Sequence, residues 1–159
     1  MAATDGYGRL QIGLHWATAA LIVGNYFISA GMPEAFDARM EGGVVGGFVP
    51  VYHVWAGVTL LALVVLRLIL RVASGVPANH QTGVQALAAN VVHWVLYAMM
   101  LAVPVLGIAA WFFGVAQAAD LHVLVMNAMM ILILGHAAMA IFHHYVLRDG
   151  LLSRMTPLR

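Results

Sequence analysis

The sequence lacks cysteine and lysine altogether, and it carries little charge of either sign. Without cysteine the chain cannot form disulfides, use a thiolate nucleophile or hold an iron–sulfur cluster through thiolates. Only 8% of its 159 residues are charged and 64% are hydrophobic, whereas soluble domains are about a quarter charged and about half apolar. The formal net charge of +1 makes nucleic acid a poor partner. The composition therefore predicts an integral membrane protein.

Four apolar stretches are long enough to cross a bilayer, which takes roughly 20 residues. The expected helices cover about residues 12–31, 49–70, 87–113 and 120–146. Pro104 should kink the third helix, and Asp120 should cap the fourth. Residues 32–48, rich in glycine, and residues 114–119 should be loops. Because short connections favour antiparallel neighbours, the sequence predicts one all-α domain, 1–159, folded as an up-down transmembrane four-helix bundle.

The N-terminal segment MAATDGYGRLQIGLHW does not resemble a cleavable signal, because no basic stretch precedes the apolar run. We therefore expect the first apolar run to be a retained helix.

The seven arginines are distributed unevenly over the two sides of this predicted bundle. Six of them fall on one side, namely Arg9, Arg67, Arg71, Arg148, Arg154 and Arg159. The opposite side receives the loop 32–48, with Glu34, Asp37 and Glu41 but a single arginine, Arg39. Since cytoplasmic loops are enriched in basic residues, both termini should lie in the cytoplasm. The chain is then a multi-pass membrane protein with an acidic outer loop.

Histidine is unusually frequent, with eight residues against six acidic ones. Ionisable side chains inside a membrane are rare and usually functional. His122 and His136 are fourteen residues apart in the fourth expected helix, which is about 21 Å along its axis and roughly 40° short of full turns. The two imidazoles therefore share one face at two depths. This arrangement suits axial ligands of two stacked haems inside a bundle.

A six-coordinate haem needs a second ligand from another helix at the same depth. Depth pairs the outer His53 with His122, and the inner His15 with His136. A lone histidine in a bundle is more often a hydrogen-bonded structural residue than a ligand. Four histidines that agree in depth and in face favour haem.

Two further histidines reach the inner depth and remain alternatives. His143 follows His136 by one heptad on nearly the same face, and His93 lies near the inner end of the third helix. Either is an alternative to His136 or His15 as a ligand. We expect His143 and its neighbour His144 to lie at the membrane boundary, where water solvates them.

Several other polar side chains have a simpler interpretation beside a functional one. Arg9 and Arg67 are candidate partners of haem propionates, with a plain topological role as the alternative, and Arg71 is expected to have only that role. His80 should be solvated in a loop. The mid-membrane amides Asn25 and Asn127 should form hydrogen bonds across helices.

Four segments, RLQIGLHW, VYHVWAGVTLLALVVLRLILR, HWVLYAMMLAVPVLG and HAAMAIFHHYVLRDGLLSRM, resemble the bacterial cytochrome b-561 family over about residues 7–156. The similarity is greatest to its diheme type that acts as a superoxide:ubiquinone oxidoreductase. The resemblance implies a four-helix membrane oxidoreductase with two haem b groups, ligated by His15, His53, His122 and His136. It also implies electron transfer from a periplasmic reactant to ubiquinone. His143 would lie near the quinone, with Arg9 and Arg148 as weaker candidates there.

Within this interpretation the electron enters at the outer haem and leaves from the inner haem, and His143 or His144 supplies protons to the quinone. The acidic outer loop departs from the family pattern, because it would repel superoxide. A second hypothesis is a cytochrome b subunit of a larger complex, serving a periplasmic dehydrogenase or cytochrome c. A third is a haem-free metal transporter or structural protein. It is weakened because the nearest acids, Asp120 and Asp149, sit at helix ends.

Overall fold

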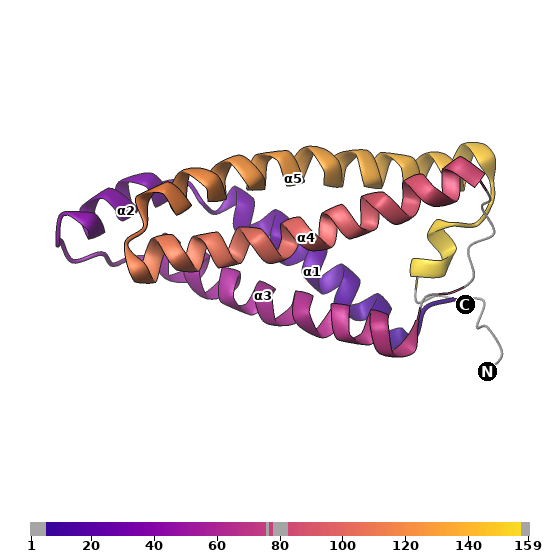
Figure 1. The fold of residues 1–159 in the computed structure, drawn as a ribbon, viewed down its shortest axis with the longest axis horizontal. Helices are drawn as coiled ribbons and strands as arrows, with labels where there is room; N and C mark the ends of the chain where they lie inside the picture. Colours follow the sequence, from indigo (N-terminus) through magenta and orange to yellow (C-terminus); the bar gives the residue numbers. More distant parts are fainter. Residues whose placement is uncertain (1–5, 76, 78–82, 157–159) are drawn as a thin grey trace.

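The computed structural model describes residues 6–75, 77 and 83–156, and in this part of the chain it contains helices and no strand. The helices are α1 (Arg9–Phe27), α2 (Met32–Met40), α3 (Phe48–Ser74), α4 (Gly83–Phe113) and α5 (Ala116–Phe142). A π-helical turn, His143–Leu147, and a short 3-10 turn, Leu152–Met155, follow. Figure 1 shows α1, α3, α4 and α5 running along the long axis, with the short α2 at one end. The predicted all-α fold is confirmed.

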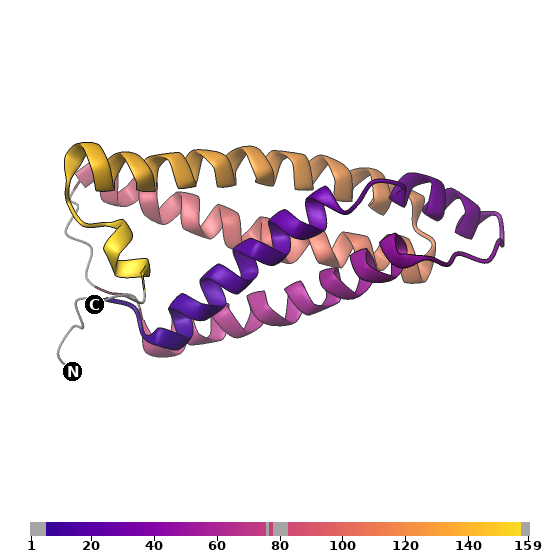
Figure 2. The ribbon, with the colours of Figure 1, turned by 180° about the vertical axis from the view of Figure 1, so that it is seen from behind.

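Three helical segments are each long and apolar enough to span a membrane: α3, α4, and α5 extended through its π-helical turn to Leu147. The first expected span is different, because α1 meets this criterion only together with α2, and the two helices are bent by 72°. Figure 2 shows α1 crossing the bundle obliquely before the chain turns into α2. The described part of the chain therefore has three spans, or four if the bent pair counts as one.

The bend and α2 replace part of the loop expected at 32–48. Helix α1 ends at Phe27, and Gly31, the N-cap of α2, adopts a left-handed conformation with φ of 88° that redirects the chain. Pro33 then lies in the first turn of α2, where its missing N–H costs nothing. The expectation of an unstructured loop was wrong here, since the flanking glycines hide a helix of nine residues.

The connection expected at 114–119 is also shorter than predicted. Gly114 turns with φ of 67°, and Val115 is the N-cap of α5. The helix thus begins four residues before Asp120, so the prediction that Asp120 caps it was wrong. This tight turn keeps α4 and α5 side by side, and α5 packs chiefly against α4.

The interior of the bundle is a small apolar core. Its buried members are Ile22, Leu60, Val64, Leu96, Tyr97, Met100, Val103 and Met129. Much of the remaining apolar surface faces outward, for example Leu124, Ile131 and Leu134 on α5. Such an apolar surface suits lipid rather than water. The backbone suits lipid as well, because helices satisfy their own N–H and C=O groups.

The two ends of the described chain meet at one end of the bundle, opposite α2. The indole Nε1 of Trp16 donates a 2.7 Å hydrogen bond to the carbonyl of Met155, which joins α1 to the last turn. Both segments lie far from α2 in Figure 1. We call the end that carries α2 the outer end and the opposite one the inner end.

Candidate functional site

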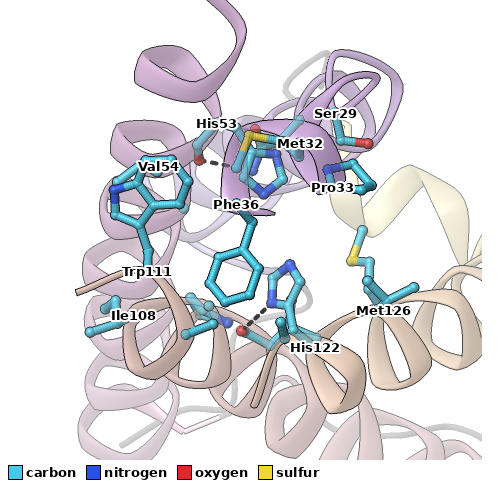
Figure 3. Close-up of a pocket in the computed structure, with 18 of the residues that line it drawn as sticks. Ser29, Met32, Pro33, Phe36, His53, Val54, Ile108, Trp111, His122 and Met126 are labelled. Atoms are coloured by element: carbon cyan, nitrogen blue, oxygen red, sulfur yellow. Dashed lines mark hydrogen bonds between the residues drawn. The ribbon is translucent and has the colours of Figure 1, made fainter. Parts of the chain in front are cut away.

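The imidazoles of His53 on α3 and His122 on α5 lie opposite each other near the outer end (Figure 3). Their ring centroids are 6.0 Å apart. The Nδ1 of His122 is 2.8 Å from the carbonyl oxygen of Val103 on α4. A carbonyl only accepts hydrogen bonds, so Nδ1 carries the proton and Nε2 keeps its lone pair. His122 is thus in the form that binds a metal through Nε2.

Gly107 on α4 makes this position of His122 possible, and the sequence interpretation missed it. A Cβ atom at residue 107 would lie 3.1 Å from both Nδ1 and Cε1 of the His122 ring. Any larger residue would therefore press on the imidazole. The only signal in the sequence was a glycine three residues after Pro104 in an otherwise apolar helix.

A cavity of about 760 Å³ lies between the helices at this level, and both imidazoles line it. This volume falls in the range of pockets that hold cofactors, roughly 300 to 1,000 Å³. The short helix α2 contributes Met32, Pro33 and Phe36 to its wall. Figure 3 shows Phe36 projecting from α2 toward the two histidines. The unexpected helix therefore covers the outer side of the site.

Arg39 fastens α2 to the outer end of α4. Its Nε donates a 2.8 Å hydrogen bond to the carbonyl of Trp111. Its guanidinium also lies over the Trp111 indole, 5.0 Å from the ring centroid. Hydrogen bonding and cation–π attraction thus act between the same two residues.

A second group of histidines lies deeper in the bundle, toward the inner end. The rings of His93 on α4 and His136 on α5 are 5.2 Å apart between centroids. His15 on α1 is near enough to both for their charges to interact with it. Its Nδ1, however, is 3.0 Å from Nη2 of Arg67 on α3. At the inner depth the structure therefore places His136 ring to ring with His93, while His15 contacts Arg67.

Hydrogen-bond partners give these inner imidazoles different tautomers. The Nδ1 of His93 is 2.5 Å from the carbonyl of Ala89, so it carries the proton and leaves Nε2 available. Arginine only donates, so the Nδ1 of His15 accepts from Arg67 and its proton is on Nε2. In this arrangement His93 is ready to ligate through Nε2, whereas His15 first has to part from Arg67.

Of the two arginines predicted to pair with haem propionates, one lies at the inner histidines and one at the surface. Arg67 is half-buried beside His15, and its guanidinium lies 5.7 Å from the ring centroid of Tyr97. Arg71 lies 5.6 Å from the Trp94 ring centroid. Arg9 is exposed at the start of α1. Arg67 is therefore the predicted propionate partner that the structure places at the inner histidines.

His143 does not lie in water as expected, because it is only 8% exposed. Its Nδ1 is 2.5 Å from Oδ2 of Asp149. Asp149 Oδ1 in turn accepts a 2.9 Å hydrogen bond from the backbone N–H of Leu151. The hydrogen bond from His143 is the main reason that the pKa of Asp149 lies below its ordinary value of 3.8. The π-helical turn that begins at His143 and the loop after it therefore bury this side chain.

Two histidines complete the set. His144 is half-buried, and its Nδ1 is buried with no hydrogen-bond partner among the described residues. It is therefore not freely solvated either. His80 lies outside the described residues, so its predicted loop position stays a prediction.

The donor groups fit haem iron better than a bare metal ion. Two imidazoles on opposite sides of one first-row metal hold their ring centres roughly 6 Å apart, because each metal–nitrogen bond is about 2 Å. The outer pair has this spacing. Within the described residues no group of three or more His, Cys, Asp or Glu side chains is gathered to hold a metal. Histidine pairs suffice for haem, since the porphyrin supplies the four remaining ligands.

Comparison with known proteins agrees with this chemistry. The family described as "Prokaryotic cytochrome b561" matches residues 6–158. The chain is 43% identical to cytochrome b562 of Cereibacter sphaeroides over 155 residues, which is 98% of each protein. It is 28% identical to the probable superoxide oxidase CybB of Yersinia pestis, over 95% of this chain and 96% of that protein. Identity to cytochrome b561 homolog 1 of Escherichia coli is 29%, over 96% and 98%.

These matches run along almost the whole chain, so they cover both histidine groups and α2 together. A chain of apolar helices with paired histidines inside, matched from residue 6 to residue 158, belongs to the prokaryotic cytochrome b561 family of haem-containing membrane electron-transfer proteins.

Proposed function

We propose that this protein carries two haem b groups and transfers electrons between a donor at its outer end and ubiquinone in the bacterial inner membrane. The observation that supports this best is the pair His53 and His122, whose ring centroids lie 6.0 Å apart at a 760 Å³ cavity. When bound, haem supplies the one-electron chemistry that side chains lack. A relative named cytochrome b562 and one named probable superoxide oxidase support the same function.

At the outer site, His53 and His122 would be the two axial ligands. The Val103 carbonyl holds the His122 ring in the tautomer that ligation requires. Helix α2 covers the cavity and limits the access of water. The ligands would thus be fixed by the bundle, and the donor would approach past α2.

At the inner site, His136 would be one axial ligand, and the other belongs to His15 or His93. The depth argument and the family resemblance give it to His15. The 5.2 Å ring separation and the Nδ1 bond to Ala89 favour His93. Arg67 is placed to neutralise a propionate on this side, which would release His15 from its present contact.

At the inner end, His143 would hold and deliver a proton to quinone. Asp149 fixes the orientation of the imidazole through Nδ1, as carboxylates do for many functional histidines. His144, the adjacent residue, is the second candidate for this role. The inner end would face the cytoplasm, because Arg67, Arg71, Arg148 and Arg154 lie toward it in the sequence pattern.

In a second candidate function the protein carries the same haems, but its electron donor is a basic protein instead of superoxide. Asp37 and Asp120 both line the outer cavity and are exposed. Glu34 and Glu41 add further negative charge on and next to α2. This charge repels an anion such as superoxide and attracts a basic redox protein. The alternative is therefore a cytochrome b subunit that accepts electrons from a basic periplasmic partner.

The deciding experiment is a pyridine hemochrome assay with quantitative protein determination. We expect two haem b per chain in the purified protein, and one in His122→Ala. A wild-type value of one haem or none would overturn the proposal.

For the inner ligand, His15→Ala and His93→Ala are compared under the same conditions. The variant that loses one haem identifies the ligand. If both variants kept two haems, the inner assignment would be wrong. Superoxide-dependent ubiquinone reduction by the isolated chain would then separate the oxidase from the subunit hypothesis.

A further inference from the structure

Asn25, in the last turn of α1, faces the outer cavity and is nearly fully buried. Its side chain is 9% exposed and belongs to the cavity wall. Its Nδ2 donates a 3.4 Å hydrogen bond to the backbone carbonyl of His53. Its Oδ1 is buried and has no partner among the described residues. Asn25 therefore touches the histidine residue while its acceptor atom stays unused.

His53 has the complementary deficiency. Its Nδ1 is also buried and has no hydrogen-bond partner within the described chain. Three buried side-chain atoms are unpartnered there, and two of them belong to this contacting pair. Buried polar atoms are nearly always satisfied, so an acceptor and a donor left unpaired on two residues in contact need an explanation. A bond between the two atoms would displace no hydrogen bond that either of them makes among the described residues.

Two other histidines, His122 and His93, have the Nδ1 acceptor that His53 lacks. The Nδ1 of His122 bonds to the Val103 carbonyl, and that of His93 bonds to the Ala89 carbonyl. A metal-binding imidazole almost always donates its second N–H to such an acceptor, which fixes the tautomer and raises the basicity of the ligating nitrogen. For His53 no acceptor lies within hydrogen-bond distance of Nδ1 among the described residues, and the residue nearest to this role is Asn25, whose backbone carbonyl interacts with the ring.

We propose that Asn25 is the positioning residue of His53, and that its Oδ1 accepts the Nδ1–H of His53 when Nε2 binds the outer iron. Because an amide has separate donor and acceptor atoms, Asn25 would bond the backbone and the ring of His53 together. It acts through His53 and touches no reacting atom. The inference rests on the outer haem of the proposed function.

The physical consequence concerns the iron's preference between two oxidation states. A hydrogen bond that strengthens imidazole as a donor favours ferric over ferrous iron, and so lowers the midpoint potential. Loss of such an outer-shell bond typically weakens metal affinity 10–100-fold. Asn25→Leu, which keeps the shape but removes the acceptor, should therefore raise the potential of the outer haem and speed its release 10–100-fold.

The experiment compares Asn25→Leu with Asn127→Leu in the purified full-length holoprotein. Asn127 lines the same cavity, but its Oδ1 accepts a 3.1 Å hydrogen bond from Tyr26 and not from a histidine. Redox titration gives the two haem potentials, and transfer of haem to apomyoglobin gives the release rates. The outer haem is identified as the component that His122→Ala lacks. Only Asn25→Leu should alter that component strongly.

If the two leucine variants changed the outer haem equally, the polarity of the cavity would matter and the positioning role would be overturned. If Asn25→Leu fails to fold, Asn25→Asp supplies the test, because it retains an acceptor. It should keep two haems and lower the outer potential, and an unchanged potential would contradict the inference. A wild-type protein with fewer than two haems would instead refute the proposed function itself.

Discussion

At the scale of single residues, the partner of each Nδ1 atom sorts the histidines into different chemical states. Backbone carbonyls hold His93 and His122 with Nε2 available, while Arg67 holds His15 in the other tautomer. A carboxylate holds His143 at the inner end. Four identical side chains are thereby placed in distinct states by their neighbours, and the variants below change such neighbours.

Gly107 offers a direct test of the outer site. An alanine in a helix is ordinarily more favourable than glycine by up to about 1 kcal/mol. At residue 107 the added methyl would lie 3.1 Å from the His122 ring. We therefore expect Gly107→Ala to displace His122, lower the haem content toward one per chain and reduce thermal stability.

The matched control is Gly135→Ala on α5, where an added methyl meets no heavy atom within 4 Å. It should keep the outer haem. An unchanged haem content and a raised melting temperature in Gly107→Ala would show that His122 tolerates the contact.

Asp149 predicts a pH dependence at the inner end. Because its folded pKa lies below 3.8, the carboxylate form stabilises the fold above that value. This contribution is lost as pH falls from 3.8 through the lower folded pKa. Asp149→Asn should open the segment after α5 already at pH 7, seen as faster hydrogen exchange over residues 143–155.

The wild-type protein should show the same opening only in acid. Asp120→Asn, a carboxylate at the outer cavity, serves as the control and should leave the inner segment protected. Equal protection in Asp149→Asn and the wild type at pH 7 would contradict the stabilising role of the pair.

At the scale of helices, α2 is the element that separates the outer cavity from the surroundings. Its attachment depends on Arg39, which bonds to the Trp111 carbonyl and lies over the indole. Arg39→Gln should cost about 1 kcal/mol, which makes the open form roughly fivefold more populated. Dithionite should then reduce the outer haem faster in stopped-flow measurements.

Glu34→Gln, a change of charge on the same helix, should leave the reduction rate nearly constant. A rate in Arg39→Gln equal to the wild type would mean that α2 does not limit access.

The long helices follow from the sequence, and the short one does not. The expected 49–70 and 87–113 lie inside Phe48–Ser74 and Gly83–Phe113, because apolar length alone specifies a span. Helix α2 has only nine residues and lies between glycines, so its sequence resembles a loop although Met32, Phe36 and Met40 recur at helical spacing. The expected fourth helix was displaced because Gly114, and not Asp120, sets its start.

The histidine groups were predictable in depth but not in detail. The order of the helices predicted that His122 and His53 lie at the same depth in the bundle. Their ring centroids are 6.0 Å apart in the structure. The partner of His136 depends on contacts between side chains far apart in the sequence, such as that of His15 with Arg67, which are 52 residues apart. Local spacing carries no information about such contacts. The burial of His143 was missed for another reason: a π-helical turn and the left-handed Arg148 fold the chain back, which brings Asp149 to the imidazole.

At the scale of the whole molecule, charge separates the two ends. The cavity at the outer end is lined by Asp37 and Asp120, and arginines lie toward the inner end. The double variant Asp37→Asn/Asp120→Asn should speed the reaction with superoxide and slow the reaction with a basic donor protein, more so at low salt. Stopped-flow rates measured across ionic strength test both effects.

If neither rate depended on these two carboxylates, the outer charge would have no part in donor selection. Leu124→Ala on the exposed face of α5 controls for nonspecific effects of substitution.

The 72° bend after α1 also has a consequence for the surrounding lipid. The 19 residues of α1 extend about 28 Å, whereas the 27 residues of α3 extend about 40 Å. The two helices therefore differ in length by about 12 Å, and a bilayer that matches α3 would have to thin on the α1 side to avoid mismatch. We expect the melting temperature to peak in vesicles of shorter acyl chains, and a protein indifferent to chain length would show that α2 fills the missing depth. The bend that closes the cavity would thus also select the membrane in which the protein is most stable.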